Sequence, residues 1–346
     1  MTQAAEGQPF HIDLGLGGTI RIGPQRIGVA EAFAIVEAIA RTGSVQGIAT
    51  ELDLSYRAAW ERLRALEAAL GHQLVQKTRG HGSTLTETGA VLREALAEAA
   101  TALAGSMARE GRAAQVRLGA VLGHATPTLT LAASHDLLLM DVLADWPDIA
   151  LVVAGSEDAV ARLVEGRADA AGFHCGPTDP AHGSPAFADL GLDPAFRVRP
   201  LFEREQGVML AAGNPLGIRT IADLARLRAR YVNRQKGSGT RLWFDRLLAE
   251  QGIAPSEIRG YATEEFTHQA VAAVIAYGAA DAGFGARAAA ERFGLAFLPL
   301  GWECYHLASS TSLPDAILDR FARTLGERAE RTAGYRAAKA PLADET

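Results

Sequence analysis

The sequence predicts an α/β protein that carries a small all-α domain at its N-terminus. Apolar residues recur at helical spacing between residues 29 and 70, and strand and helix patterns alternate from residue 129 to about residue 290. Such alternation is typical of a sheet with parallel strands and helices on its faces. A chain of 346 residues is too long for one ordinary core, so we expect two or three domains.

The first domain is predicted to hold three helices followed by a β-hairpin. These elements are expected at residues 29–42, 45–54, 56–71, 74–78 and 83–85. Ser44 and Ser55 can each cap the helix that follows them. The order of elements is that of a winged helix-turn-helix, in which the third helix enters the major groove of DNA. The alternative is a plain helical bundle whose third helix is solvated, but it does not account for the hairpin.

The hairpin, or wing, carries cationic side chains that can reach DNA phosphates. Lys77 lies on its first strand, and Arg79 and His81 lie in its turn. No acidic residue falls between Glu67 and Glu87, so this segment is locally basic. Contacts to DNA are therefore predicted at Lys77 and Arg79.

The stretch GSVQGIATELDLSYRAAWERLRALEAALGHQLVQKTRGHGSTLTETG resembles the DNA-binding domain of the molybdate-responsive ModE regulators and, more loosely, that of the LysR-type regulators. The resemblance covers roughly residues 25–95. It implies that the third helix reads DNA through Ser55, Tyr56 and Arg57, with Arg64 as a further candidate. Trp60 either joins these residues or packs inside the domain.

The Ala-rich stretch from Thr86 to about Arg112 is predicted to be one helix that pairs with its copy in a homodimer or higher oligomer. It carries an apolar seam that starts with four-three-four spacing, made of Leu92, Leu96, Ala99, Leu103 and Met107. The alternative is that the helix packs on its own domain. A dimer would place two recognition helices on two-fold related DNA sites.

Polar residues gather where strands of the α/β part end and helices begin. Residues 129–133, 149–155 and 168–175 are predicted strands with helices between them, and a second lobe is expected over residues 200–285. In such sheets the carboxyl ends of strands and the N-termini of helices meet at one edge, where ligands bind. The hydroxyl and N–H donors at that edge suit an anion.

The stretch VNRQKGSGTRLWF, residues 232–244, has the strongest such pattern, because its glycines let backbone N–H groups converge at a helix start. It lacks the Gly-Lys-Ser/Thr end of a P-loop and the third glycine of a dinucleotide fingerprint. For any single junction the alternative is ordinary helix capping. The predicted ligand-binding residues are Ser134, His135, Ser156, His174, Arg234, Gly237, Ser238, Gly239, Thr240, Arg241, Thr267 and His268.

No catalytic residue, metal site or cofactor is predicted. The histidines of the α/β part form no i, i+4 pair and join no cysteine at the spacing of a zinc site. The sequence has no Gly-x-Ser-x-Gly elbow and no evident catalytic triad, so we expect no enzyme.

Five blocks of the second part are similar to the periplasmic-binding-protein-like (PBP-like) domain that occurs in some regulators and beside molybdenum cofactor enzymes. They are SHDLLL, RADAAGFH, REQGVMLAAGNP, VNRQKGSGTR and EEFTHQAVAAVIAYGAADAGFGARAAA. The resemblance runs from about residue 128 to residue 310 and implies two lobes of the type II arrangement that close on a small ligand. A ModE regulator has a pair of small β-barrels instead, so the ModE resemblance does not carry over that family's molybdate site.

The expected domain organisation follows from these segments. It comprises an N-terminal extension (1–24), a winged helix-turn-helix (25–85), a dimerisation helix (86–112), a linker (113–127), a two-lobed PBP-like domain (128–325) and a C-terminal tail (326–346).

Together the patterns predict a ligand-responsive transcriptional regulator that binds promoter DNA and senses a small anion. Molybdate or tungstate, or a molybdenum cofactor species, ranks first on the resemblance. A LysR-like regulator of a small carboxylate such as formate is the alternative. An alternative of another class is a solute-binding or catalytic α/β protein with no DNA role.

Composition agrees with local rather than general DNA contact. The net charge is -6, whereas proteins devoted to nucleic acid are usually basic. Two cysteines, Cys175 and Cys304, lie far apart in sequence and form no disulfide framework. We expect a cytoplasmic protein without a membrane partner, because the N-terminus has no signal-peptide pattern and no uncharged apolar run reaches roughly 18 residues.

Overall fold

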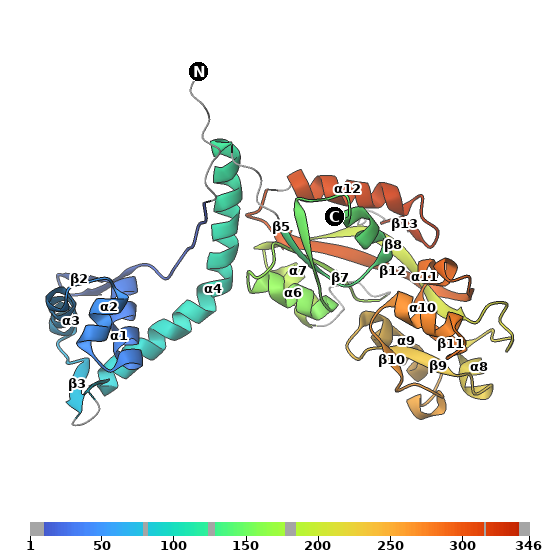
Figure 1. Cartoon of the computed structure of the whole chain (residues 1–346), viewed down its shortest axis with the longest axis horizontal. Coiled ribbons are helices and arrows are strands. Elements are labelled where there is room, and N and C mark those ends of the chain that lie inside the picture. Colours follow the sequence, from blue (N-terminus) through green and yellow to red (C-terminus); the bar gives the residue numbers. More distant parts are fainter. Residues whose placement is uncertain (1–9, 79–81, 124–128, 177–184, 315, 339–346) are drawn as a thin grey trace, which may run out of the picture. The chain divides into compact units, whose positions relative to one another are not determined.

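The computed structural model describes residues 10–78, 82–123, 129–176, 185–314 and 316–338 (Figure 1). The chain divides into two compact units. One is Ile12–Gly111, and the other contains the chain from Arg112 onward together with the segment before Ile12.

The smaller unit is the winged helix-turn-helix that the sequence predicts. Its elements are β1 (Thr19–Ile22), β2 (Gln25–Gly28), α1 (Val29–Thr42), α2 (Val45–Glu51), α3 (Tyr56–Leu70), β3 (Val75–Thr78) and β4 (Gly82–Leu85). Ser44 and Ser55 cap α2 and α3, since their side chains accept hydrogen bonds from the backbone N–H groups of Gly47 and Ala58. The antiparallel pair β1–β2 was not predicted, and β1 falls within the expected extension 1–24.

Helix α4 (Glu87–Leu122) is longer than expected, because it continues through most of the predicted linker 113–127. Residues 124–127 of that linker lie outside the described residues. Glycines at positions 111 and 119 weaken the helical pattern of the sequence. Position 111 requires glycine because the backbone of Ile12 passes close to it, and a Cβ there would lie 2.7 Å from the Ile12 carbonyl oxygen.

The larger unit is built on a sheet with the strand order β10-β9-β11-β8-β12-β7-β5-β6, and β13 pairs with β8. The strands are β5 (Leu129–Ala133), β6 (Ile149–Val153), β7 (Ala170–His174), β8 (Phe196–Leu210), β9 (Tyr231–Arg234), β10 (Glu264–Glu265), β11 (Ala282–Ala286), β12 (Ala296–Ser310) and β13 (Tyr335–Ala337). The helices are α5 (Leu137–Leu143), α6 (Ser156–Val164), α7 (Pro185–Leu192), α8 (Ile221–Arg226), α9 (Gly239–Glu250), α10 (His268–Ala276), α11 (Arg287–Arg292) and α12 (Ala316–Ala329), with a 3-10 turn at Pro255–Glu257.

Two antiparallel strands of 15 residues each, β8 and β12, connect two lobes of this unit. β12 pairs with β7 through Tyr305–Ser309, in the first lobe, whereas β8 pairs with β11 through Gln206–Leu210, in the second lobe. Each lobe has its own apolar clusters. This is the two-lobed α/β domain that the sequence predicts.

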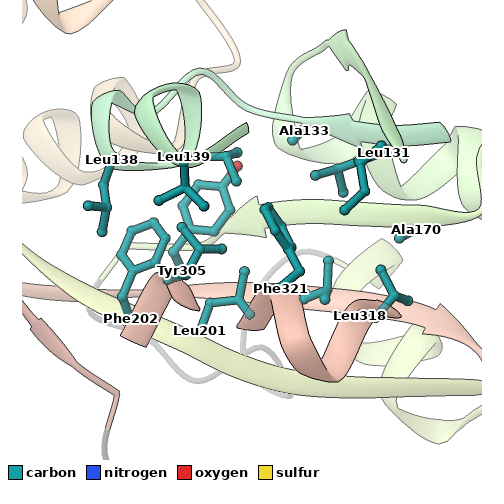
Figure 2. Packing of buried hydrophobic residues seen from close by; sticks show 14 of the residues in the cluster. Leu131, Ala133, Leu138, Leu139, Ala170, Leu201, Phe202, Tyr305, Leu318 and Phe321 are labelled. Atoms are coloured by element: carbon teal, nitrogen blue, oxygen red, sulfur yellow. The ribbon is translucent and has the colours of Figure 1, made fainter. Parts of the chain in front are cut away.

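The core of the first lobe forms where helices cover β8 and β12. The rings of Phe202 and Tyr305 stack with centroids 5.0 Å apart, and Figure 2 shows them beneath Leu138 and Leu139 of α5. Phe321 of α12 is part of the same cluster. The expected C-terminal tail from residue 326 differs from the structure, because it includes the end of α12 and strand β13, whose Tyr335 is buried.

Candidate functional site

A cavity of about 290 Å³ lies where both lobes contribute residues. The first lobe provides residues that follow β5 and β6 and the end of β7, and the second lobe provides the segment after β9 and the start of α10. Nine predicted residues line it: Ser134, His135, Ser156, His174, Arg234, Gly237, Ser238, Gly239 and Thr267. The carboxyl ends of strands therefore meet at this site, as the sequence pattern predicts.

Three of the hydroxyl oxygens at this cavity accept hydrogen bonds from backbone N–H groups. The oxygens of Ser238 and Thr267 cap α9 and α10, so their hydroxyl protons remain for a ligand. The Ser156 oxygen accepts the backbone N–H of His174. Ser134 differs, because its hydroxyl donates to the Tyr305 hydroxyl at 3.0 Å.

Arg234 is the cationic group of the cavity that is buried, with 7% of its surface exposed. Its Nη2 donates to the Phe266 carbonyl at 2.9 Å, and its Nε donates to the Gln235 side-chain oxygen at 3.2 Å. Within the described part of the chain, Arg234 makes no ion pair with a carboxylate. Burial, and repulsion from Arg204, lower its pKa to about 10, so the guanidinium stays charged at neutral pH.

A buried charge network lies among β8, β12 and β7. Arg204 on β8 is fully buried, and it donates to Glu303 and to Asp136 at 2.8 Å each. The other Glu303 oxygen lies 3.0 Å from Nδ1 of His174. Burial opposes the charge of Glu303, but His174 and Arg204 overcome this penalty and hold its pKa at about 2. The network fixes the His174 ring at the cavity.

Three histidines are neutral at neutral pH. Burial is the largest cause of the lowered pKa in His135, His174 and His268, and nearby arginines lower it further. Nδ1 of His268 accepts the backbone N–H of Ala286 at 3.2 Å, so the proton of this neutral ring is on Nε2. Nε2 of His268 and Nδ1 of His135 are both buried, and neither has a hydrogen-bond partner in the part of the chain that is described.

Three predicted residues, Thr240, Arg241 and His268, do not line the cavity. Arg241 is buried by its own lobe, where it pairs with Asp245 and Glu264. The phase of helix α9 explains this, since successive side chains turn by roughly 100° and only the first residues face the cavity. Six further residues line the cavity without having been predicted: Val153, Ala154, Gly155, Gln235, Lys236 and Phe266. Gly155 and Lys236 stand beside predicted residues in the same junctions, whereas the apolar residues among the six had no polar pattern to mark them, and Phe266 is 72% exposed.

The start of α3 presents the predicted DNA-reading residues to solvent. Tyr56 is exposed, and Arg57 is exposed and pairs with Glu61 one turn along the helix. Lys77 on the wing is exposed, whereas Arg79 lies outside the described residues.

Arg64 and Trp60 form a pair on the surface of α3. The Arg64 guanidinium lies 4.8 Å from the centroid of the Trp60 ring and also pairs with Glu67. Trp60 is 44% exposed. Of the two alternatives for Trp60, the structure therefore supports the surface position and not the interior one.

The described residues include neither a candidate membrane span nor a candidate metal cluster. No helix there is both long and apolar enough to span a membrane. No cluster of three or more His, Cys, Asp or Glu side chains there could hold a metal ion.

Two protein families match the chain. The bacterial regulatory helix-turn-helix proteins of the lysR family match residues 30–90, and the PBP superfamily domain matches residues 144–326. The LysR-type resemblance of the first domain is thus confirmed, whereas the ModE resemblance stays a prediction.

Similar individual proteins were also found. YvgK of Bacillus subtilis (strain 168), described as uncharacterised, is 30% identical over 154 residues, which cover 44% of this chain and about half, 50%, of YvgK. The HTH-type transcriptional regulator CbbR of Rhodospirillum rubrum is 28% identical over 263 residues, covering 73% of this chain and 78% of CbbR. The crystal structure of ArgP from Mycobacterium tuberculosis has 18% identity and a TM-score of 0.46, with 89% of this chain and 98% of ArgP covered.

Proposed function

This chain belongs to the PBP superfamily and joins its PBP domain to a LysR-family helix-turn-helix, and we propose that it regulates transcription in response to a small oxyanion, molybdate or tungstate. The LysR-family domain and the regulators among its relatives indicate a transcriptional regulator rather than an enzyme. The PBP domain would hold the effector, and the helix-turn-helix would bind promoter DNA.

The anion proposal rests mainly on the buried guanidinium of Arg234, which has no carboxylate partner among the described residues. A buried cation without a carboxylate partner is costly, and an anionic ligand in the cavity would supply the missing charge. Charge-assisted hydrogen bonds from the guanidinium and from the hydroxyl groups of Ser238 and Thr267 would surround such a ligand. The N-terminus of α9, a helix of 12 residues, adds its partial positive charge.

The size of the cavity favours an inorganic oxyanion over a cofactor. Its volume of about 290 Å³ lies at the lower end of the roughly 300–1,000 Å³ found for small-molecule pockets. A tetrahedral oxyanion with a few water molecules fits such a space, whereas a pterin cofactor with its phosphate would fill or exceed it. We therefore rank molybdate and tungstate above molybdenum cofactor species, and formate, which also fits this volume, is the alternative that the test below addresses.

Coupling to DNA requires that the anion favour one state of the protein over another. Because residues of both lobes line the cavity, an anion that contacts both would stabilise the closed arrangement. A homodimer held by α4 would convert that change into a different placement of its two recognition helices on DNA.

The test is a thermal-shift screen of the full-length protein with sodium molybdate, tungstate, sulfate, phosphate and formate at equal ionic strength. We expect molybdate and tungstate to raise the melting temperature in proportion to the logarithm of their concentration. A shift with formate alone would favour the carboxylate alternative, and a shift with none of the five would contradict the anion proposal. A gel-shift assay with the chain's own promoter region, with and without the stabilising anion, then tests DNA coupling.

A further inference from the structure

Cys175 and Cys304 lie on neighbouring strands of the first lobe, although they are far apart in sequence. β7 and β12 pair antiparallel, with Tyr305 opposite His174 and His306 opposite Phe173. In this register the residue after His174 stands opposite the residue before Tyr305. Continued by one residue past the end of the ladder, this register places Cys175 opposite Cys304.

Two side-chain contacts place both thiols on the same face of the sheet. The rings of His306 and Phe173 stack on that face with centroids 5.4 Å apart, and the Cys304 sulfur lies 4.0 Å from Nδ1 of the same His306. Cys175 packs against the apolar cluster that contains Phe173. Both cysteines are half-buried thiols.

The spacing of opposed strand residues suits a covalent bond between the two sulfurs. Residues directly opposite each other in an antiparallel pair have Cα atoms roughly 4.5–5.5 Å apart. A disulfide needs a Cα separation of about 4.4–6.8 Å with side chains on one face. The opposed position next to the His174–Tyr305 pair therefore suits a disulfide.

We propose that Cys175 and Cys304 form a redox-modification site, at which an oxidant of the peroxide class converts the two thiols into a disulfide that ties β7 to β12. The His306 imidazole beside Cys304 can take up the thiol proton, and the thiolate is the reactive form. The Cys304 thiolate attacks one peroxide oxygen, the O–O bond breaks, and the products are a sulfenic acid and, after protonation, water. Cys175 then attacks the sulfenic sulfur, the S–S bond forms, and a second water leaves. Two thiols are oxidised by two electrons, and one peroxide is reduced to two waters.

The site adjoins the residues that position the anion cavity. Cys175 directly follows His174, and Cys304 directly follows Glu303. His174 and Glu303 are themselves hydrogen-bonded, with Nδ1 of His174 3.0 Å from the Glu303 carboxylate. β12 is also one of the two strands that connect the lobes. A disulfide here would fix β7 to a connecting strand, whichever anion the cavity binds.

The experiment treats the reduced full-length protein with stoichiometric hydrogen peroxide and then counts thiols in denaturant. We expect both thiols to be lost, the intact mass to fall by about 2 Da, and a non-reducing peptide map to link the Cys175 and Cys304 peptides. Dithiothreitol should restore both thiols. The near-isosteric variants Cys175→Ser and Cys304→Ser serve as controls, because each should keep its fold and yield no cross-linked peptide.

Three outcomes would overturn the proposal. Both thiols could survive peroxide that oxidises a free-cysteine standard. The mass could instead rise by whole oxygen atoms, which would mean separate oxidation of each sulfur. Finally, the disulfide could form only between two copies of the chain, as a dimer on a non-reducing gel would reveal.

Discussion

Gly239 at the start of α9 faces the His174 ring at the end of β7, and a Cβ on residue 239 would lie 2.8 Å from that ring. The two residues belong to different lobes, so their contact requires the lobes to be close together. The ring cannot easily yield, because Glu303 holds its Nδ1. Glycine at position 239 is therefore a requirement of the closed arrangement.

We predict that Gly239→Ala weakens anion binding by holding the lobes apart. The dissociation constant of the stabilising anion should rise by roughly tenfold or more, equivalent to about 1.4 kcal/mol. Titration calorimetry on the full-length protein measures it. Gly326→Ala is the matched control, because a Cβ there meets nothing within 4 Å. Equal affinities of the two variants would show that the contact is not needed for binding.

The two buried arginines should respond oppositely to replacement by methionine. Arg204 pairs with Glu303 and Asp136, so Arg204→Met leaves two buried carboxylates uncompensated and should cost about 3–5 kcal/mol of folding free energy. Arg234 has no such carboxylate partner among the described residues, so Arg234→Met should leave the melting temperature of the anion-free protein unchanged or higher.

The same Arg234→Met variant should lose the anion-induced rise in melting temperature. Thermal melts with and without the anion measure both effects in one experiment. A strong loss of stability without anion, or an undiminished anion shift, would contradict the role given to Arg234.

The sequence predicted those site residues whose position follows from their immediate neighbours in the chain. Ser134, Ser156, Ser238 and Thr267 stand at junctions of a strand and a helix, and the pattern alone placed them at one edge. The direction in which a side chain leaves a helix was harder to predict. Arg241 belongs to the same glycine-bearing stretch as Ser238, but its side chain pairs with Asp245 and does not line the cavity.

Contacts across the sheet could not be predicted at all. β8 has the sequence FRVRPLFEREQGVML, in which Arg204 and Gln206 are typical of solvent, yet both are buried. Their partner Glu303 lies on β12, about a hundred residues later, and only the register of the two strands brings them together. The same reason hid the opposition of Cys175 and Cys304.

Stability should fall as the pH falls below neutrality. The lowered pKa values of His135, His174 and His268 mean that the unfolded chain takes up protons near pH 6.5 while the folded protein does not. Each such histidine should reduce the free energy of unfolding by up to about 1.4 kcal/mol per pH unit. Glu303, with its pKa lowered to about 2, adds a further loss only as the pH falls below its ordinary value of 4.5.

Urea unfolding between about pH 7 and pH 5 measures the histidine contribution. His268→Gln should flatten the slope, because it removes a buried histidine whose pKa lies well below its ordinary value. A stability that rises on acidification in this interval would show that these histidines are charged in the folded protein.

DNA binding should depend on the exposed start of α3 more than on the rest of that helix. Arg57→Ala should weaken promoter binding by about 1–3 kcal/mol if the guanidinium contacts a base. Arg62→Ala is the matched control on the same helix, because Arg62 pairs with Glu31 of α1. Lys77→Ala on the wing should instead reduce the slope of log affinity against log salt by about one. Gel shifts at several salt concentrations separate these effects, and equal behaviour of Arg57→Ala and Arg62→Ala would refute the recognition assignment.

The apolar seam predicted on α4 is divided by the structure, and the division suggests where a dimer would form. Leu92 and Leu96 pack against the core of their own domain, whereas Leu103 is 46% exposed. The first part of the seam is therefore used within the chain, as the intrachain alternative expects, and the later part remains for a second copy.

Leu103→Asp should dissociate a dimer held by α4, since it would bury a carboxylate in an apolar contact. Sedimentation velocity at several concentrations measures this, with the exposed neighbour Thr101→Asp as control. Dimerisation of Leu103→Asp as strong as that of the parent would place the dimer contact elsewhere on the chain.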